Sequence, residues 1–156
     1  MTDEVWNTER LHDHFAQSLR VSEMYYDSKT EHQRLKVFQN GTFGRVLTLD
    51  DVVQTTEGDN FIYHEMLTHV PILAHGAAKR VLIIGGGDGG ILREVLCHKG
   101  VKKVIMAEID QIVIDACVEH MPSINNAGKV YEDPRTRLIV GDAFAYVLET
   151  ELKFDA

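Results

Sequence analysis

The sequence is short of the features that mark several large protein classes. It has two cysteines and three prolines in 156 residues and no low-complexity tract, so a disulfide-stapled scaffold and a disordered chain are both disfavoured. No apolar run approaches the roughly 18 residues that span a bilayer, and the polar, acidic start is unlike a signal peptide. A formal net charge of −8 disfavours nucleic acid and anionic membranes as partners.

The two isolated thiols, Cys97 and Cys117, indicate a cytoplasmic setting, where thiols stay reduced. A disulfide between them stays open as the alternative. Neither cysteine has a base or a motif beside it, so neither is assigned a role as a nucleophile.

The chain changes character near residue 60. Before that point short extended runs alternate with turn signals such as Asn40-Gly41, which predicts a small antiparallel β domain over residues 1–60. Four such runs are expected to be strands, namely 21–28, 33–40, 44–50 and 52–56.

From residue 61 the apolar period becomes helical, with Pro71 expected to kink or end the first helix. Strands are then expected at 80–85, 103–110 and 136–142, and helices at 89–99, 111–122 and 143–149. Alternating strands and helices with continuous apolar strands predict an α/β domain over residues 61–156, with a parallel sheet covered on both faces.

The last residues, 151-ELKFDA-156, read as the approach to a fourth strand. A sheet of three strands with a fourth just beginning would keep an apolar edge unpaired. We therefore expect a sheet that is truncated relative to its fold, with completion by a partner or a swapped copy as the alternative.

A glycine-rich run, 81-VLIIGGGDGGILREVL-96, joins the first of these strands to a helix. Gly85, Gly87 and Gly90 fit the pattern G-x-G-x-x-G, and Glu108 ends the next strand, where a carboxylate can accept hydrogen bonds from ribose hydroxyls. The spacing predicts a nucleotide or nucleoside site. A tight turn that binds nothing is the alternative.

Asp88 separates the ligand classes that such a loop could bind. A phosphate would sit at the helix N-terminus, and a carboxylate about 4 Å away would repel it by on the order of 4 kcal/mol at an effective dielectric of 20. A nucleoside with a cationic tail, such as the sulfonium S-adenosylmethionine, would be attracted instead. A helix N-cap is the alternative role for Asp88.

The same run, taken as 81-VLIIGGGDGGILRE-94, resembles the signature of the bacterial spermidine synthases, which are polyamine aminopropyltransferases. The runs 52-VVQTTEGDNFIYHEMLTHVP-71, 31-EHQRLKVFQN-40, 43-FGRVLTLD-50 and 106-MAEID-110 resemble that family too. The resemblance covers the chain and about the first half of a family member. It implies a small β domain followed by a Rossmann-like, methyltransferase-type sheet.

The resemblance implies transfer of an aminopropyl group from decarboxylated S-adenosylmethionine to putrescine, which gives spermidine and methylthioadenosine. Decarboxylated S-adenosylmethionine is then a co-substrate, and neither a cofactor nor a metal is implied. A homodimer or homotetramer is implied as the assembly.

Residue roles also follow from the resemblance. Asp88 would hold the ammonium group of the aminopropyl tail, Glu108 the ribose, and Asp142 the adenine amino group, with the Ala143 backbone nearby. Gln33 and Gln54 would line the donor site beside Gly85 and Gly87. The diamine would contact Tyr63, His64 and Asp88.

Two departures from the family are visible. Asn60 stands where the family more often has glutamate, and the family's proton-accepting aspartate would lie beyond Ala156. No catalytic base is therefore expected within these 156 residues, and we expect little activity from the chain alone. A methyltransferase that uses intact S-adenosylmethionine, a nicotinamide enzyme and a non-catalytic nucleoside-binding chain are the alternatives.

A zinc site is rejected on spacing. His64 and His69 are five residues apart, whereas a zinc-binding helix places its histidines four apart on one face.

Overall fold

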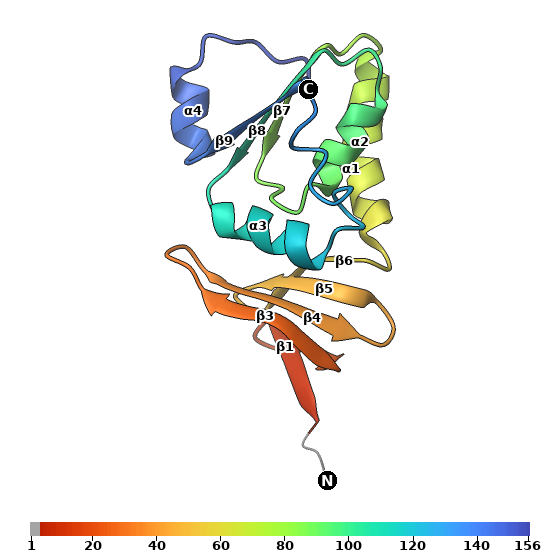
Figure 1. The fold of residues 1–156 in the computed structure, drawn as a ribbon, viewed down its shortest axis with the longest axis vertical. Coiled ribbons are helices and arrows are strands. Elements are labelled where there is room, and N and C mark those ends of the chain that lie inside the picture. Colours follow the sequence, from red (N-terminus) through yellow and green to blue (C-terminus); the bar gives the residue numbers. More distant parts are fainter. Residues whose placement is uncertain (1–3) are drawn as a thin grey trace. The chain divides into compact units, whose positions relative to one another are not determined.

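The computed structural model of the chain describes residues 4–156. The chain divides into two compact units, Met1–Asn60 and Phe61–Ala156. Antiparallel strands build the first unit, and parallel strands alternating with helices build the second (Figure 1). The predicted α/β class, with antiparallel strands followed by a parallel sheet, is confirmed.

Two antiparallel sheets make up the described part of the first unit. One pairs β1 (Val5–His12) with β2 (Phe15–Val21). The other has the order β3-β4-β5-β6, with the bounds Glu23–Lys29, Arg34–Asn40, Gly44–Leu49 and Val52–Thr56. The inner strands β4 and β5 supply the core, since five of their apolar side chains are at most 2% exposed: Leu35, Val37, Phe38, Val46 and Leu47.

The predicted turn at Asn40-Gly41 is present, and a second tight turn joins β5 to β6. The Asn40 side chain closes the first by accepting from the backbone N–H groups of Thr42 (2.9 Å) and Phe43 (3.1 Å). Asp50 and Asp51 form the second, with φ values of 49° and 68°. Two consecutive left-handed residues give the backbone twist that a two-residue hairpin connection needs, and this fixes the register of β5 against β6.

The hairpin of β1 and β2 was not among the predicted strands. Its connection, Asp13-His14, has no glycine or asparagine, and both strands are largely exposed. The hairpin therefore carries neither a strong turn signal nor a buried apolar face. Four of its apolar side chains are about half exposed, namely Val5, Trp6, Leu11 and Phe15.

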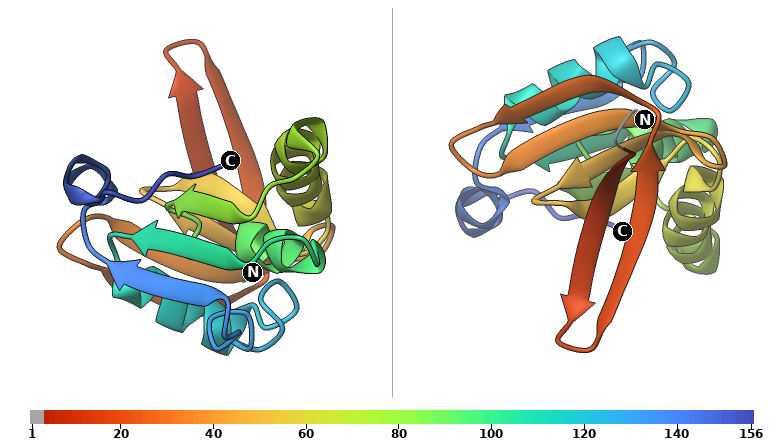
Figure 2. Two further views of the ribbon diagram at one scale, coloured as in Figure 1. Left: turned by 90° about the horizontal axis from the view of Figure 1, so that it is seen from above. Right: turned by 90° about the horizontal axis from the view of Figure 1, so that it is seen from below.

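The second unit is a three-stranded parallel sheet with helices. Its elements are α1 (Asn60–His75, whose first residue ends the first unit), β7 (Arg80–Ile84), α2 (Gly90–Cys97), β8 (Lys103–Glu108), α3 (Gln111–His120), β9 (Thr136–Val140) and α4 (Ala143–Glu149). The strand order is β7-β8-β9. In Figures 1 and 2, α1 and α2 lie on one side of the strands and α4 on the other.

The central strand β8 explains the continuous apolar run in the sequence. Val104, Ile105, Met106 and Ala107 are at most 1% exposed, because both faces of a parallel strand are covered and no position points to water. Leu92 and Val95 of α2 pack into the same core.

Helix α1 runs four residues past Pro71, to His75. The expectation that Pro71 could end the helix was therefore wrong. A proline lacks the N–H group that would bond the carbonyl four residues earlier, which usually breaks a helix. Here Ile72, the next residue, is 6% exposed in the core, and this packing holds the last turn in place.

The last residues lie along β7, on the edge opposite β8. Asp155 N–H donates to the Arg80 carbonyl (2.8 Å), and Leu82 N–H donates to the Ala156 carbonyl (2.9 Å). After β9 the chain thus returns to the far side of β7 (Figure 2). The winding of the sheet reverses at β7, and ligands of open α/β sheets bind where this reversal meets the carboxyl ends of the strands.

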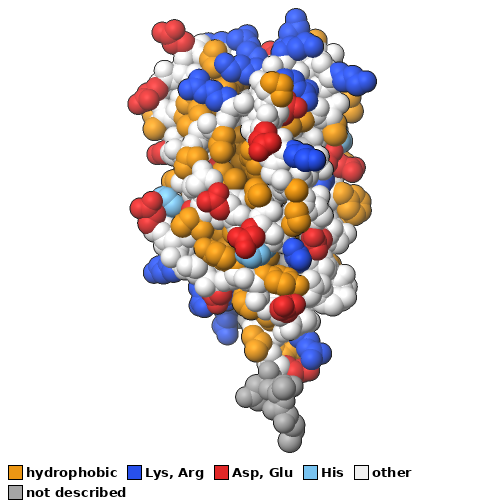
Figure 3. Space-filling model, viewed as in Figure 1, with side chains coloured by type: hydrophobic (Ala, Val, Ile, Leu, Met, Phe, Trp, Pro, Cys, Tyr) orange, Lys and Arg blue, Asp and Glu red, His pale blue; other side chains and the backbone are white. Residues whose placement is uncertain are grey.

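One face of α1 is apolar and open to solvent. Seven large apolar side chains of this helix are half exposed or more, namely Phe61, Ile62, Tyr63, Met66, Leu67, Val70 and Leu73. Figure 3 likewise has hydrophobic side chains at the surface among charged ones. None of the helices in residues 4–156 has the length and apolar character needed to span a bilayer.

Candidate functional site

The loops that follow β7, β8 and β9 meet at the carboxyl edge of the sheet. Gly85 N–H donates to the Ala107 carbonyl of β8 (2.8 Å), and Gly141 N–H donates to the Glu108 carbonyl (2.8 Å). The glycine loop, Glu108 and the start of α4 are therefore brought to one edge.

The glycine loop folds tightly because its glycines meet two separate requirements. Gly85, Gly86 and Gly89 have φ values of 77°, 79° and 80°, a region that side chains with a Cβ rarely adopt. At Gly87 a Cβ would lie 2.9 Å from Val113, and at Gly90 it would lie 2.1 Å from the His64 ring. The backbone of the loop can thus lie close to a ligand and also to the side chains of Val113 and His64.

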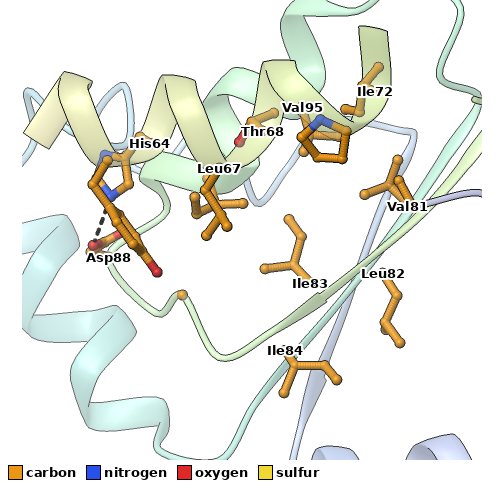
Figure 4. A pocket seen from close by; sticks show the side chains of 15 residues that line it. His64, Leu67, Thr68, Ile72, Val81, Leu82, Ile83, Ile84, Asp88 and Val95 are labelled. Carbon is orange, nitrogen blue, oxygen red and sulfur yellow. Dashed lines mark hydrogen bonds and ion pairs between the residues drawn. The ribbon is translucent and has the colours of Figure 1, made fainter. Parts of the chain in front are cut away.

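Asp88 is the polar centre of this loop, and its side chain is only 12% exposed. Its Oδ1 accepts from Gly90 N–H at 2.7 Å, while its Oδ2 lies 3.3 Å from Nε2 of His64 (Figure 4). The N-cap position of α2 is Gly89 and makes no side-chain cap. Asp88 lies one residue before the N-cap, and its Oδ1 accepts the hydrogen bond that an N-cap side chain usually accepts. Its Oδ2 is therefore left to contact another group.

Glu108 ties the glycine loop to β8. It is 7% exposed; Oε2 accepts from Gly87 N–H (2.9 Å) and Oε1 from Asp110 N–H (3.0 Å). A carboxylate oxygen has two lone pairs, so each oxygen keeps one acceptor position. The sequence anticipated a carboxylate at this edge, but it did not anticipate that the carboxylate also holds the loop.

Two residues that support the loop were missed by sequence reasoning. Asn125 is fully buried and donates to the carbonyls of Asp88 (3.2 Å) and Cys117 (3.1 Å), while its own oxygen accepts from Gly128 N–H (2.9 Å). The Tyr131 hydroxyl donates to the Gly87 carbonyl at 2.9 Å. Both come from the irregular segment between α3 and β9, where the turn-forming run 125-NNAG-128 was the available signal.

A cavity of about 360 Å³ opens between α1 and β7 beside Asp88. Leu67 of α1 and Ile83 of β7 point toward one another across it (Figure 4). His64 and Asp88 form one polar end, and the Thr68 hydroxyl, which is buried and has no hydrogen-bond partner, also lines it. Apolar walls with a carboxylate at one end suit an aliphatic chain that carries a cation.

The charge around the loop is negative. Burial raises the pKa of the Tyr131 hydroxyl far above its ordinary value, and the charges of Cys117, Asp88 and Glu108 add to the shift. Burial likewise raises the pKa of the Cys117 thiol, with Asp88 and Glu108 adding to it. These carboxylates thus act on their neighbours through a low-dielectric interior, a setting that disfavours a phosphate and favours a cation.

The other predicted residues of the second unit are less enclosed. Asp142 is exposed and caps α4, since its Oδ1 accepts from Phe144 N–H at 2.7 Å; Ala143 is the first residue of that helix. Tyr63 is 60% exposed, and its ring meets His64 edge-on at a centroid distance of 5.6 Å.

Gln33 and Gln54 belong to the first unit. Gln33 closes the turn before β4, where its N–H donates to the Thr30 hydroxyl at 3.1 Å. Gln54 lies exposed on β6, and its amide donates to the Val52 carbonyl at 3.2 Å. Their predicted place in a donor site stays a prediction.

His69 contacts two polar side chains outside its own helix. Its Nδ1 lies 2.8 Å from Nε2 of His98, and its Nε2 lies 3.3 Å from the Glu94 carboxylate. Across residues 4–156 no three histidine, cysteine, aspartate or glutamate side chains gather so that they could hold a metal ion. Partial burial raises the pKa of the exposed Cys97 thiol, with Glu94 adding to the shift, so this thiol is not activated.

Two family models match the chain. The model described as "Spermine/spermidine synthase domain" matches residues 60–156, and the model described as "Spermidine synthase tetramerisation domain" matches residues 5–57.

Individual proteins agree with these models. A polyamine aminopropyltransferase of Ruegeria sp. (strain TM1040) is 74% identical over 155 residues, which cover 99% of this chain and 54% of that protein. Polyamine aminopropyltransferase 1 of Pseudomonas aeruginosa is 53% identical over 94% of this chain and 51% of its own length. The chain thus spans about half the length of the curated relatives it matches.

Solved structures share the fold. The crystal structure of spermidine synthase from Thermotoga maritima has a TM-score of 0.89 at 37% identity, over 96% of this chain and 52% of that one. A spermidine synthase in complex with the transition-state analogue AdoDATO has a TM-score of 0.90 at 36% identity, over 97% of this chain and 53% of that one.

Proposed function

The chain belongs to the spermine/spermidine synthase family, and on that premise we propose that it forms the donor-binding part of a polyamine aminopropyltransferase. The reaction would move an aminopropyl group from decarboxylated S-adenosylmethionine to putrescine and give spermidine and methylthioadenosine. The observation that carries this proposal is Asp88, a nearly buried carboxylate in a glycine loop that is otherwise built for a nucleotide.

Asp88 would recognise the ammonium group of the aminopropyl arm. Its Oδ1 is fixed by Gly90 N–H, and its Oδ2 faces the cavity end beside His64. The same carboxylate would repel the carboxylate of intact S-adenosylmethionine. At roughly 4 Å and an effective dielectric of 20, each such interaction is on the order of 4 kcal/mol, enough to decide between the two donors.

The remaining donor contacts follow from the geometry of the sheet edge. Glu108 would accept from the ribose hydroxyls with its remaining lone pairs, and Asp142 with the Ala143 backbone would meet the adenine. The Gly85 and Gly87 backbone would lie against the nucleoside. We keep Gln33 and Gln54 as donor-site residues, and we propose that the two compact units are two domains, of which residues 61–156 bind the nucleoside.

Tyr63 and His64 would contact the diamine beside Asp88. In the proposed step the lone pair of a putrescine amine attacks the carbon next to the sulfonium. The carbon–sulfur bond breaks, its electron pair stays on sulfur, and the new secondary ammonium group loses a proton to become the amine. Holding the two reactants in line supplies much of the rate. We assign no proton acceptor among the 156 residues.

We propose that the first unit mediates assembly into a homodimer or homotetramer. A family model described as a tetramerisation domain matches residues 5–57, and Trp6 and Phe15 of the β1–β2 hairpin are about half exposed. We also propose a cytoplasmic setting, in which Cys97 and Cys117, both free thiols here, would stay reduced.

Calorimetric titration tests the proposal directly. The chain should bind decarboxylated S-adenosylmethionine at least about a hundredfold more tightly than intact S-adenosylmethionine, which corresponds to about 2.7 kcal/mol. Tighter binding of the carboxylated donor would favour a methyltransferase and overturn the proposal.

An Asp88→Asn variant isolates the charge, since the amide oxygen can still accept from Gly90 N–H. The preference for the decarboxylated donor should fall to less than about tenfold, or 1.4 kcal/mol. Asp115→Asn is the matched control, because Asp115 is exposed on α3; it should keep the full preference. If both variants showed the same preference for the decarboxylated donor, Asp88 would not be the residue that recognises its ammonium group.

A further inference from the structure

The glycine loop needs contacts from outside to fix its conformation. Five of the six residues from Gly85 to Gly90 are glycines, and a glycine backbone adopts many conformations that other residues avoid. Asp88 is the one residue of this run with a side chain. The direction of its carboxylate therefore depends on the groups that hold the backbone on either side of it.

The irregular segment between α3 and β9 contacts three consecutive residues of the loop. The Tyr131 hydroxyl donates to the Gly87 carbonyl at 2.9 Å, and the Asn125 amide donates to the Asp88 carbonyl at 3.2 Å. Both side chains also lie against Gly89. A Cβ on that residue would be 2.5 Å from the Tyr131 oxygen and 2.8 Å from the Asn125 Cβ. The loop is thus held on both sides of its aspartate.

The two hydrogen bonds orient both peptide groups next to Asp88. A trans peptide group is planar, so fixing its carbonyl also fixes its N–H, which points the opposite way. Tyr131 fixes the peptide group between Gly87 and Asp88. Asn125 fixes the one between Asp88 and Gly89. These two planes define the φ and ψ angles of Asp88, and its Cβ therefore has one direction.

The two supports are themselves held in the interior. Asn125 is fully buried and also donates to the Cys117 carbonyl at 3.1 Å. Burial raises the pKa of the Tyr131 hydroxyl, and neighbouring negative charges, including those of Asp88 and Glu108, add to the shift. Since phenols ordinarily titrate near pH 10, this hydroxyl keeps its proton and stays a hydrogen-bond donor at neutral pH.

We propose that Asn125 and Tyr131 are positioning residues for ligand recognition, because they aim the Asp88 carboxylate at the place where the ammonium group of the ligand would lie. A carboxylate that is ordered before the ligand arrives does not have to be ordered on binding, and this raises affinity for the group it meets. This inference rests on the proposed function, in which Asp88 binds that ammonium group.

The test compares two nucleosides by calorimetric titration. Decarboxylated S-adenosylmethionine carries the ammonium group on its aminopropyl arm, and methylthioadenosine has neither this arm nor a charge. In Tyr131→Phe the Gly87 carbonyl loses its donor, so the ratio of the two affinities should fall by about fivefold or more. The affinity for methylthioadenosine should stay within about twofold, since Glu108 still accepts from Gly87 N–H.

This ratio separates positioning from a role in folding alone. A variant that only unfolds more has less binding-competent chain, which lowers both apparent affinities by the same factor. Tyr25→Phe is the matched control, since the Tyr25 hydroxyl donates to Gln39 at 3.4 Å in the first unit. Its loss should leave the ratio unchanged within about twofold.

A double-mutant cycle tests whether Tyr131 acts through Asp88. In Asp88→Asn the ammonium group no longer meets a charged carboxylate. Adding Tyr131→Phe to that variant should therefore change the ratio by less than about twofold. A further fall of about fivefold would show that the tyrosine acts independently of Asp88, and this would overturn the inference.

Asn125→Ala should lower the ratio more than Tyr131→Phe does, by about tenfold or more, because the Asp88 and Cys117 carbonyls both lose their donor. Circular dichroism in the far ultraviolet first establishes that the variant is folded. A folded variant with an unchanged ratio would overturn the role of Asn125. If it does not fold, Tyr131→Phe and the double-mutant cycle decide.

Two failures are distinguishable. If the unmodified chain prefers the cationic nucleoside and Tyr131→Phe keeps the full ratio, or loses both affinities in parallel, the positioning role is overturned and the proposed function stands. Equal affinities of the unmodified chain for both nucleosides, or no binding of either, would overturn the proposed function and this inference with it.

Discussion

The loops that follow β7 and β9 each place an aspartate just before a helix, and the two aspartates lie in different surroundings. Each joins a parallel strand to a helix, and in each an aspartate Oδ1 accepts a backbone N–H two residues on at 2.7 Å, from Gly90 in one and from Phe144 in the other. Asp142 is exposed and is the N-cap of α4. Asp88 is nearly buried and faces His64.

The difference comes from what surrounds the two helices. Helix α2 buries Leu92 and Val95 in the core, whereas α4 buries no residue in this structure. A cap on an exposed helix stabilises that helix and little more. A carboxylate beside a buried helix start carries charge into a place of low dielectric, where it can select a ligand. The hydrogen bond alone therefore does not tell a structural aspartate from a binding one.

The largest effect should come from closing the space that the first loop requires. In Gly90→Ala the new Cβ would lie 2.1 Å from the His64 ring, which is buried. We expect a loss of about 3 kcal/mol in the free energy of unfolding, measured by chemical denaturation. Gly41→Ala is the control, since nothing lies within 4 Å of its Cβ, and it should change stability by less than about 0.5 kcal/mol. Equal losses would show that the contact is not rigid.

A smaller effect should come from removing the support beneath the loop. Asn125→Ala would strip hydrogen-bond partners from the Asp88 and Cys117 carbonyls and from Gly128 N–H. We expect a loss of about 2–3 kcal/mol in unfolding free energy. Tyr131→Phe, which loses one bond to the Gly87 carbonyl, should cost about 1 kcal/mol. A larger loss in Tyr131→Phe than in Asn125→Ala would show that Tyr131 is the main support of the loop.

The smallest effect belongs to the second loop. Asp142→Ala removes the cap of α4 and should cost about 1 kcal/mol or less, seen as faster amide hydrogen exchange in residues 143–149. Asp142→Ser keeps a capping oxygen and should stay within about 0.5 kcal/mol of the unmodified chain. If serine and alanine behave alike, the bond from Phe144 N–H contributes nothing measurable.

Much of the fold could be predicted because its signals are local. The apolar run of β8 and the Asn40-Gly41 turn each follow from a few neighbouring residues. The β1–β2 hairpin could not be predicted, since its strands are exposed and its turn, Asp13-His14, is chemically ordinary. Helix α1 passes Pro71 because packing of Ile72 outweighs a local penalty, and tertiary packing is invisible in a local pattern.

The candidate site likewise contains residues that could be predicted from the sequence and residues that could not. The glycines, Asp88 and Glu108 follow from strand–loop–helix spacing, which fixes where their backbone must lie. Asn125 and Tyr131 lie 37 and 44 residues along the chain from the loop residues that they contact. Both belong to an irregular segment whose sequence has neither a helical nor a strand period. The pairing of His64 with Asp88 also depends on how α1 packs on α2, which spacing does not encode.

Trp6 gives this molecule a built-in optical label. It is the single tryptophan of the sequence, and it sits half exposed on β1, in the hairpin that we propose for assembly. Indole fluorescence moves to shorter wavelength when water is withdrawn from the ring. A dilution series followed by intrinsic emission would therefore report whether copies of the chain come together through this hairpin, without any dye.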